Sequence, residues 1–110
     1  MSRNINRLLK DQKLTPFQKR VLLVTCKIPK GQVRSYKWVA KKAGSPKSFR
    51  AVGQVLKINP FPITIPCHRV VKNGGTLGGF ALGVKKKEEL LLKEGLTVEG
   101  GVVIINRRKE

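Results

Sequence analysis

The residue best suited to chemistry in this chain is Cys67, which stands directly before the single histidine, His68. A free thiol has a pKa of about 8.5, so little of it is thiolate at neutral pH, and a nucleophilic cysteine needs a base or a positive neighbour. His68 is such a base, Arg69 adds a positive charge, and no acidic residue lies near them in the sequence. We expect this setting to favour the thiolate.

Three interpretations fit the pair of Cys67 and His68. The first is a buried structural thiol beside a hydrogen-bonded histidine, which is the usual situation in a small core. The second is a cysteine hydrolase, although neighbouring residues on a strand point to opposite faces and make a direct Cys–His pair awkward. The third is a nucleophile that is activated indirectly, for example through a water. The chemistry of the residues leaves all three open.

The stretch before Cys67 predicts three helices. Thr15 caps the first, with Pro16 at its first position and Gln18 three residues after the cap, and Pro29 and Gly31 end it. The second helix runs from a Ser35 cap to about Ala43, with Gly44 as its stop, and the third starts at once at Ser45-Pro46 and ends at Asn59-Pro60. Two helices joined by a tight Gly-Ser turn form a helix-turn-helix.

The third helix has two different faces. At about 100° per residue, Phe49, Val52 and Leu56 share one side. The opposite side carries cations, a polar residue and a small residue that permits close approach, as a DNA-recognition helix requires; these are Lys47, Arg50, Ala51 and Gln54. An ordinary amphipathic surface helix fits the same pattern.

The remaining pattern predicts a mainly α fold with a small β hairpin, a winged helix-turn-helix DNA-binding domain spanning residues 1–110. A hairpin after a helix-turn-helix supplies the wing, and Asn73-Gly74-Gly75 is a turn signal. The expected elements are a short helix at 3–12, strands at 63–65 and 69–72, a helix at 85–94 with Gly95 as its C-cap, and a strand at 102–105.

The charge of the chain points to a polyanionic partner. Its 24 Lys and Arg outnumber 6 Asp and Glu, giving a formal net charge of +18. Seventeen of the cations lie between Asp11 and Glu88, where no acidic residue occurs. Such uncompensated charge destabilises a compact chain, and double-stranded DNA would relieve it. A purely solubilising charge is the alternative.

Composition also bears on location and cofactors. No apolar run reaches the roughly 20 residues of a membrane span, and the first residues lack the apolar segment of a signal peptide. We therefore expect a cytoplasmic location (nuclear in a eukaryote) without contact with membranes. We also expect a monomer. In that compartment Cys26 and Cys67 are free thiols, and one histidine with two cysteines does not suit a structural zinc site. We expect neither a metal nor another cofactor.

The segment Ile65-Pro66-Cys67-His68-Arg69-Val70 resembles the active-site motif of the O6-alkylguanine-DNA alkyltransferases. These proteins move an alkyl group from guanine onto a cysteine in one irreversible event, and O4-alkylthymine is the second substrate that the resemblance implies. The resemblance covers residues 15–95. Further matches, in the order of the family, are Phe17-Gln18, Ile28-Pro29-Lys30-Gly31, Ser35-Tyr36, Arg50-Ala51-Val52-Gly53, Asn59-Pro60, Gly78-Gly79, Lys87, Leu91-Leu92 and Glu94-Gly95.

The resemblance implies a role for each residue of the site. Cys67 attacks the alkyl carbon, His68 acts as the base through a water, Glu94 orients His68, and Asn59 is a polar hinge for the active-site turn. From the sequence alone, Glu94 is also consistent with an ordinary surface carboxylate, and Asn59 is also consistent with an ordinary Asn-Pro turn.

The resemblance extends to the pocket for the base. Tyr36 would donate to the leaving base, although it also fits a core aromatic, and Val70 would offer backbone carbonyls to the exocyclic amine. The chain departs from the family at Phe80, where a tyrosine is usual, and at Ala81, where a serine is frequent. A pocket hydroxyl is thereby lost.

On the DNA side, the reacting carbon is buried in the base stack, so the family flips the damaged base out of the duplex. Arg50 corresponds to the residue that fills the vacated place, and the small Ala51 and Gly53 permit close approach in the minor groove. We also expect Ser35, Lys47 and Gln54 to contact DNA.

Two other functions compete with alkyl transfer. Alkyltransferase-like proteins bind the lesion without chemistry and recruit other repair, but they typically carry another residue in place of the cysteine. A plain winged-helix transcription factor has no need for Asn59, Cys67, His68 and Glu94 together.

Overall fold

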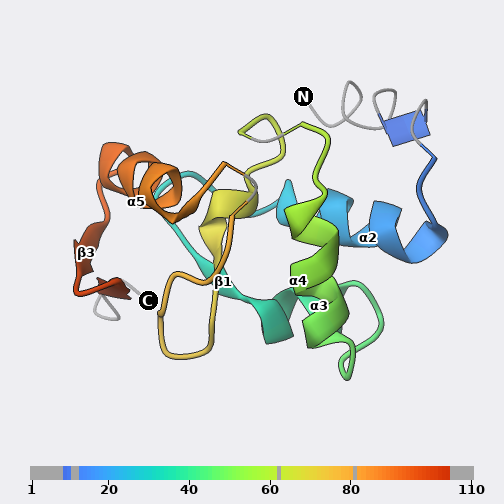
Figure 1. Cartoon of the computed structure of the whole chain (residues 1–110). Coiled ribbons are helices and arrows are strands. Elements are labelled where there is room, and N and C mark those ends of the chain that lie inside the picture. Colours follow the sequence, from blue (N-terminus) through green and yellow to red (C-terminus); the bar gives the residue numbers. More distant parts are fainter. Residues whose placement is uncertain (1–8, 11–12, 62, 81, 105–110) are drawn as a thin grey trace.

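The computed structural model describes residues 9–10, 13–61, 63–80 and 82–104, and these form helices with two small sheets. In Figure 1 the helices α2, α3 and α4 gather on one side, α5 and β3 lie on the other, and β1 runs between them. None of the described helices is long and apolar enough to cross a membrane. The elements are α2 (Pro16–Thr25), β1 (Arg34–Ser35), α3 (Tyr36–Lys42), α4 (Phe49–Lys57), the 3-10 helix η1 (Cys67–Arg69), β2 (Val70–Val71), α5 (Val84–Lys93), β3 (Thr97–Glu99) and β4 (Val102–Ile104).

Helix α2 begins where the sequence predicts and ends earlier. Thr15 and Gln18 form a complete capping box, with N–O distances of 3.1 and 2.8 Å. The helix ends at Thr25, and the predicted extension to Pro29 is wrong, because Ile28 donates its backbone N–H to Thr25 over 3.1 Å in a tight turn. The turn still buries Ile28, so the apolar spacing reflects burial and not a continued helix.

The helix-turn-helix is present with a longer turn than expected. The Ser35 side chain caps α3 by accepting the N–H of Trp38 at 3.0 Å, as predicted. The expected start of the third helix at Ser45 is wrong, since α4 begins at Phe49. Ser45 donates its N–H back to Ala40, and the hydroxyls of Ser45 and Ser48 lie 2.6 Å apart, so these groups are used in a turn before α4.

The two faces of α4 are those that the sequence predicts. Val52, Val55 and Leu56 are buried in the main core with α2 and α3, while Arg50, Ala51 and Gln54 are exposed. Lys47 is also exposed, but it lies in the turn before the helix. The exposed face of α4 is therefore free to meet a large partner.

The fold is mainly helical around a helix-turn-helix with a small β hairpin, as expected, and the turn predicted at residues 73–75 is present, with the N–H of Gly75 donating to the Lys72 carbonyl at 2.9 Å. The predicted strand at 63–65 is wrong. Ile63 lies in a turn with φ 77°, and the N–H of Ile65 closes that turn on Phe61. Strand β2 pairs in parallel with β1, which lies far back in the sequence, with Arg34 opposite Val70. The antiparallel hairpin is β3–β4, residues 97–104. Strand β2 thus follows a distant partner, whereas the N–H of Ile65 bonds locally to Phe61.

Two cores flank η1. The main core joins α2, α3 and α4 to the segment around Cys67, and a smaller one joins β2, α5 and β4 through Val71, Leu91 and Val103. Helix α5 agrees with the predicted helix at 85–94, and Gly95 has the positive φ, 89°, of a helix end. The predicted helix at 3–12 lies outside the described residues except for residues 9 and 10, which are helical, and the end of the 102–105 strand also lies outside them.

Candidate active site

Cys67 begins η1 at the edge of the main core, and its residue is only 2% exposed. The buried Asn59 donates both amide hydrogens, one to the Ile65 carbonyl at 3.0 Å and one to Sγ of Cys67 at 3.2 Å. Its Oδ1 accepts the N–H of Phe61 at 2.9 Å. Asn59 therefore joins the end of α4, the following turn and the thiol, which is the geometry that a polar hinge requires.

Burial raises the pKa of the Cys67 thiol, and the hydrogen bond from Asn59 and the charge of Lys87 oppose that rise without cancelling it. The expectation that the sequence neighbours favour the thiolate is therefore wrong for this site. Arg69 is next in sequence, but its guanidinium turns to Glu94. Deprotonation of Cys67 consequently depends on a base.

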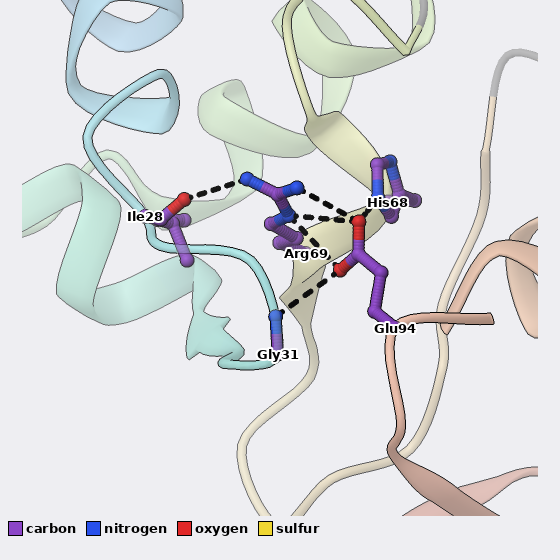
Figure 2. A network of polar contacts seen from close by, with 5 residues as sticks. All are labelled: Ile28, Gly31, His68, Arg69 and Glu94. Atoms are coloured by element: carbon purple, nitrogen blue, oxygen red, sulfur yellow. Dashed lines mark hydrogen bonds and ion pairs between the residues drawn. The ribbon is translucent and has the colours of Figure 1, made fainter. Parts of the chain in front are cut away.

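His68 is buried and bound to Glu94, as Figure 2 shows. Its Nε2 lies 2.9 Å from Oε2 of Glu94, and among the described residues its buried Nδ1 has no hydrogen-bond partner. Burial lowers the pKa of His68 despite the carboxylate. Burial alone would raise the pKa of Glu94, but the hydrogen bonds from Arg69 and His68 bring it below its usual value. A neutral imidazole that donates from Nε2 leaves Nδ1 as an acceptor.

Cys67 and His68 lie on a 3-10 helix and not on the strand that the sequence predicts. The two side chains still form hydrogen bonds with different partners: the thiol with Asn59 and the imidazole with Glu94. A direct Cys–His pair of the protease kind is thus not the arrangement here.

Lys87 is a site residue to which sequence reasoning assigned no role. It is 0% exposed, and its ammonium donates to the carbonyls of Val70 at 2.7 Å, Gly79 at 3.1 Å and Leu77. Burial lowers its pKa to about 8. Helical spacing could have indicated that Lys87 is buried, because it stands four residues before the apolar Leu91 and so lies on the same face of α5.

A surface cavity of about 440 Å³ opens beside α4. Tyr36 is half-buried in the wall of this cavity. Burial is the main cause that raises the pKa of Tyr36, and the nearby Cys67 raises it further. A Cβ on Gly78 would lie 2.8 Å from the Tyr36 hydroxyl, so only glycine allows this approach. The lining residues are Tyr36, Lys37, Phe49, Arg50, Gly53, Gln54, Lys57, Lys72, Asn73 and Gly79.

The other predicted pocket residues lie around His68. The Phe80 ring meets the imidazole edge-on, with centroids 6.2 Å apart, and the Val70 carbonyl accepts a hydrogen bond from the Lys87 ammonium. Ala81 lies outside the described residues. In the described part of the chain, no group of three or more Cys, His, Asp and Glu is placed to hold a metal.

Of the residues predicted to contact DNA, the cavity includes Arg50, Gly53 and Gln54. Ala51 and Lys47 are exposed outside its lining, and Ser35 is occupied in capping α3. The lining contains four Lys and Arg residues and no acid, so its potential is positive and attracts phosphate.

Comparison with known proteins places this site in a family. The family model described as 6-O-methylguanine DNA methyltransferase, DNA binding domain, matches residues 16–96. A methylated-DNA–protein-cysteine methyltransferase of Methanothermobacter thermautotrophicus is 46% identical over 78% of this chain and 48% of its own length. One from Salmonella typhimurium is 48% identical over 74% of this chain and 47% of its own length. The chain thus spans about half the length of these curated relatives.

Solved structures of similar proteins agree with this family assignment. The Mycobacterium tuberculosis O6-methylguanine methyltransferase has a TM-score of 0.70 at 42% identity, over 76% of this chain and 51% of its own. S. pombe Atl1, in complex with damaged DNA containing O6-carboxymethylguanine, has a TM-score of 0.73 at 28% identity, over 89% of this chain and 95% of its own. On the family match and these similarities, the chain belongs to the 6-O-methylguanine DNA methyltransferase family and carries its DNA-binding domain.

Proposed function

We propose that this chain repairs alkylated guanine in double-stranded DNA by transferring the alkyl group from O6 to Sγ of Cys67. The observation that carries the proposal is the state of His68, a buried neutral base with Nε2 held by Glu94 and Nδ1 unpartnered among the described residues. The names of the relatives, methylated-DNA–protein-cysteine methyltransferases, support the same chemistry.

The reaction balances within the site. A proton leaves Sγ of Cys67 and reaches Nδ1 of His68 through a bridging water, and Glu94 stabilises the imidazolium that forms. The thiolate forms a C–S bond as the O6–C bond breaks, and guanine leaves after taking a proton, for which the Tyr36 hydroxyl is the donor. The proton held by His68 then returns to the Tyr36 oxygen through solvent, so both residues end in their starting states. The resulting thioether is stable to thiol exchange, so each molecule reacts once and needs no cofactor.

The site must receive the guanine outside the helix, since its alkyl carbon is shielded in the stack. The positive cavity beside α4 is the entry side, and Arg50 on its rim is the residue that would occupy the vacated position in the duplex. Ala51 and Gly53 supply the small surface for close contact with the minor groove.

Incubation with a duplex containing O6-methylguanine tests the proposal. Intact mass should rise by one methyl group per chain, and peptide mapping should place it on Cys67. The matched control is the same duplex with unmodified guanine, which should leave the mass unchanged. A label on Cys26 would overturn the assignment of the acceptor.

Lesion recognition without transfer is the second candidate. The likeness to S. pombe Atl1 on damaged DNA favours it, because that similarity covers nearly the whole of both chains. Selective binding of the O6-methylguanine duplex with no change in protein mass would establish this alternative.

Arg50 provides a test of base flipping. The Arg50→Ala chain should keep its fold, because this side chain is exposed, and should transfer from duplex DNA about tenfold more slowly or worse, equal to ~1.4 kcal/mol of barrier. It should react almost normally with free O6-benzylguanine, which needs no flipping. Placing the lesion opposite a poorly paired base should restore part of the rate, because unstacking then costs less.

The matched control is Arg34→Ala, which removes an arginine that bonds Gln32 outside this cavity. Equal losses with duplex and free base in the Arg50 variant would indicate a distorted pocket instead, and the flipping role would be withdrawn.

A further inference from the structure

Glu94 occupies a position that is electrostatically unfavourable for a carboxylate. It is the C-cap residue of α5, and the C-terminal end of a helix carries partial negative charge that repels an anion. Its side chain is only 10% exposed, so water gives it little stabilisation. His68 supplies one hydrogen bond, but a neutral imidazole brings no charge. The compensating cation is Arg69.

Arg69 holds this carboxylate by a two-pronged contact. Its Nε lies 3.0 and 3.2 Å from the two oxygens of Glu94, and its Nη2 lies 2.8 Å from Oε2. Both side chains are mostly buried, at 16% and 10% exposure, so the pair is not a screened surface contact. The planar guanidinium therefore sets the angle at which Glu94 meets His68.

The same guanidinium ties the carboxylate to a third part of the chain. Its Nη1 donates to the Ile28 carbonyl at 2.8 Å, and the N–H of Gly31 points to Oε1 of Glu94 at 3.5 Å. Figure 2 shows Arg69 between the turn after α2 and Glu94, with His68 on the other side of the carboxylate. Glu94 is thus fixed from three directions by residues distant in sequence.

Charge sharing is the second effect of this contact. The charged groups that act on His68 are Glu94, which favours the imidazolium, and Arg69 and Lys87, which oppose it; Cys67 is its titratable neighbour on η1. A bare carboxylate at 2.9 Å would favour the imidazolium and oppose the burial that keeps His68 neutral. With its charge shared by Arg69, the carboxylate orients the imidazole and favours the imidazolium less, so burial keeps His68 neutral.

We propose that Arg69 is a positioning residue for alkyl transfer, which fixes the Glu94 carboxylate and shares its charge so that His68 stays neutral with Nδ1 open to the Cys67 proton. This inference rests on the proposed function. In the step it serves, one proton passes from Sγ to Nδ1, and neither Glu94 nor Arg69 gains or loses a proton.

Because the chain has one histidine, NMR titration reads the pKa of His68 without assignment. In Arg69→Met, that pKa should rise by about 1 pH unit or more, as expected when a cation is removed from beside the base. The low-pH limb of the transfer rate should move up by the same amount. The control is Arg20→Met, which removes an arginine that bonds the Ala43 carbonyl away from the site and should change neither quantity.

Two further variants separate charge from position. Arg69→Lys keeps the charge but cannot fill the three nitrogen positions of the guanidinium, so the pKa of His68 should stay near its original value while transfer slows about tenfold. In a Glu94→Gln background, Arg69→Met should move the pKa of His68 less than it does with Glu94 present.

A folded Arg69→Met chain with unchanged pKa of His68 overturns the proposal, and so does an Arg69→Lys chain with the original transfer rate. If Arg69→Met does not fold, the Arg69→Lys result decides. The titration requires no DNA, so it is separable from the proposed function: a chain that accepts no alkyl group but shows the expected changes in His68 would refute transfer and retain the Arg69–Glu94–His68 geometry.

Discussion

Replacing Cys67 with serine is expected to abolish alkyl transfer completely and to leave the affinity for duplex DNA unchanged. A serine hydroxyl can still accept the hydrogen bond from Asn59, so the turn should keep its shape. Its pKa, however, lies far above that of a thiol, and the neutral His68 cannot ionise it. The residues that we propose to face DNA are exposed side chains of α4, whereas Cys67 is buried.

The matched control is Cys26→Ser, since Cys26 is the other thiol of the chain. It forms the C-cap of α2, and burial raises its pKa to about 11, so it offers almost no thiolate. Mass spectrometry of both variants with the O6-methylguanine duplex, beside a fluorescence binding titration, makes the comparison. Methyl transfer to the Cys67→Ser chain, or its loss from the Cys26→Ser chain, would contradict the assignment.

Asn59→Asp is expected to have the second largest effect. An aspartate has nearly the same shape but cannot donate to Ile65 and Sγ when ionised, and its charge would oppose formation of the thiolate. Transfer at neutral pH should fall by about a hundredfold or more, the effect of a rise of ~2 pH units in the pKa of Cys67. Stopped-flow transfer assays across a range of pH measure it.

The stability of the Asn59→Asp chain should depend on pH in a defined direction. A buried carboxyl beside a thiol and a carbonyl has a folded-state pKa above the value of about 3.9 that it has in the unfolded chain. Above that value the folded state holds more protons, so the free energy of unfolding falls by up to ~1.4 kcal/mol per pH unit as the pH rises. Urea unfolding at several pH values tests this sign.

Asn59→Ala is the control for lost hydrogen bonds alone. It removes the bonds to Ile65, Phe61 and Sγ and should lower the free energy of unfolding by about 2–3 kcal/mol, with no added pH dependence. If the aspartate and alanine variants show the same dependence on pH, the buried environment assigned to Asn59 is incorrect.

Local rules made several features predictable from the sequence. The capping box of Thr15 and Gln18, the Ser35 cap and the Gly95 helix end are contacts within a few residues, so the sequence specifies them wherever the helices pack. The polar face of α4 was predictable for the same reason, since helical periodicity alone separates Arg50 and Gln54 from Val52.

The pairing of β2 could not be predicted in this way. The segments 63–65 and 69–72 have apolar residues suited to strands, and the turn signal at 73–75 favours a local hairpin. In the fold, β2 instead pairs in parallel with β1, and the residues before it turn into η1. Pairing of strands depends on which edge the packed helices leave open, which no short stretch of sequence encodes.

By itself, the sequence determined that Cys67 and His68 are neighbours, that the chain is strongly basic, and that its central helices form a DNA-binding unit; the motif around Cys67 supplied the chemistry by resemblance. Only the tertiary structure decided the electrostatics of the site. It turned Arg69 to a glutamate 25 residues away, buried Lys87 among three carbonyls, and raised the pKa of Cys67. The physical reason is that burial and distant charges set a pKa, and both arise only when separate segments pack together.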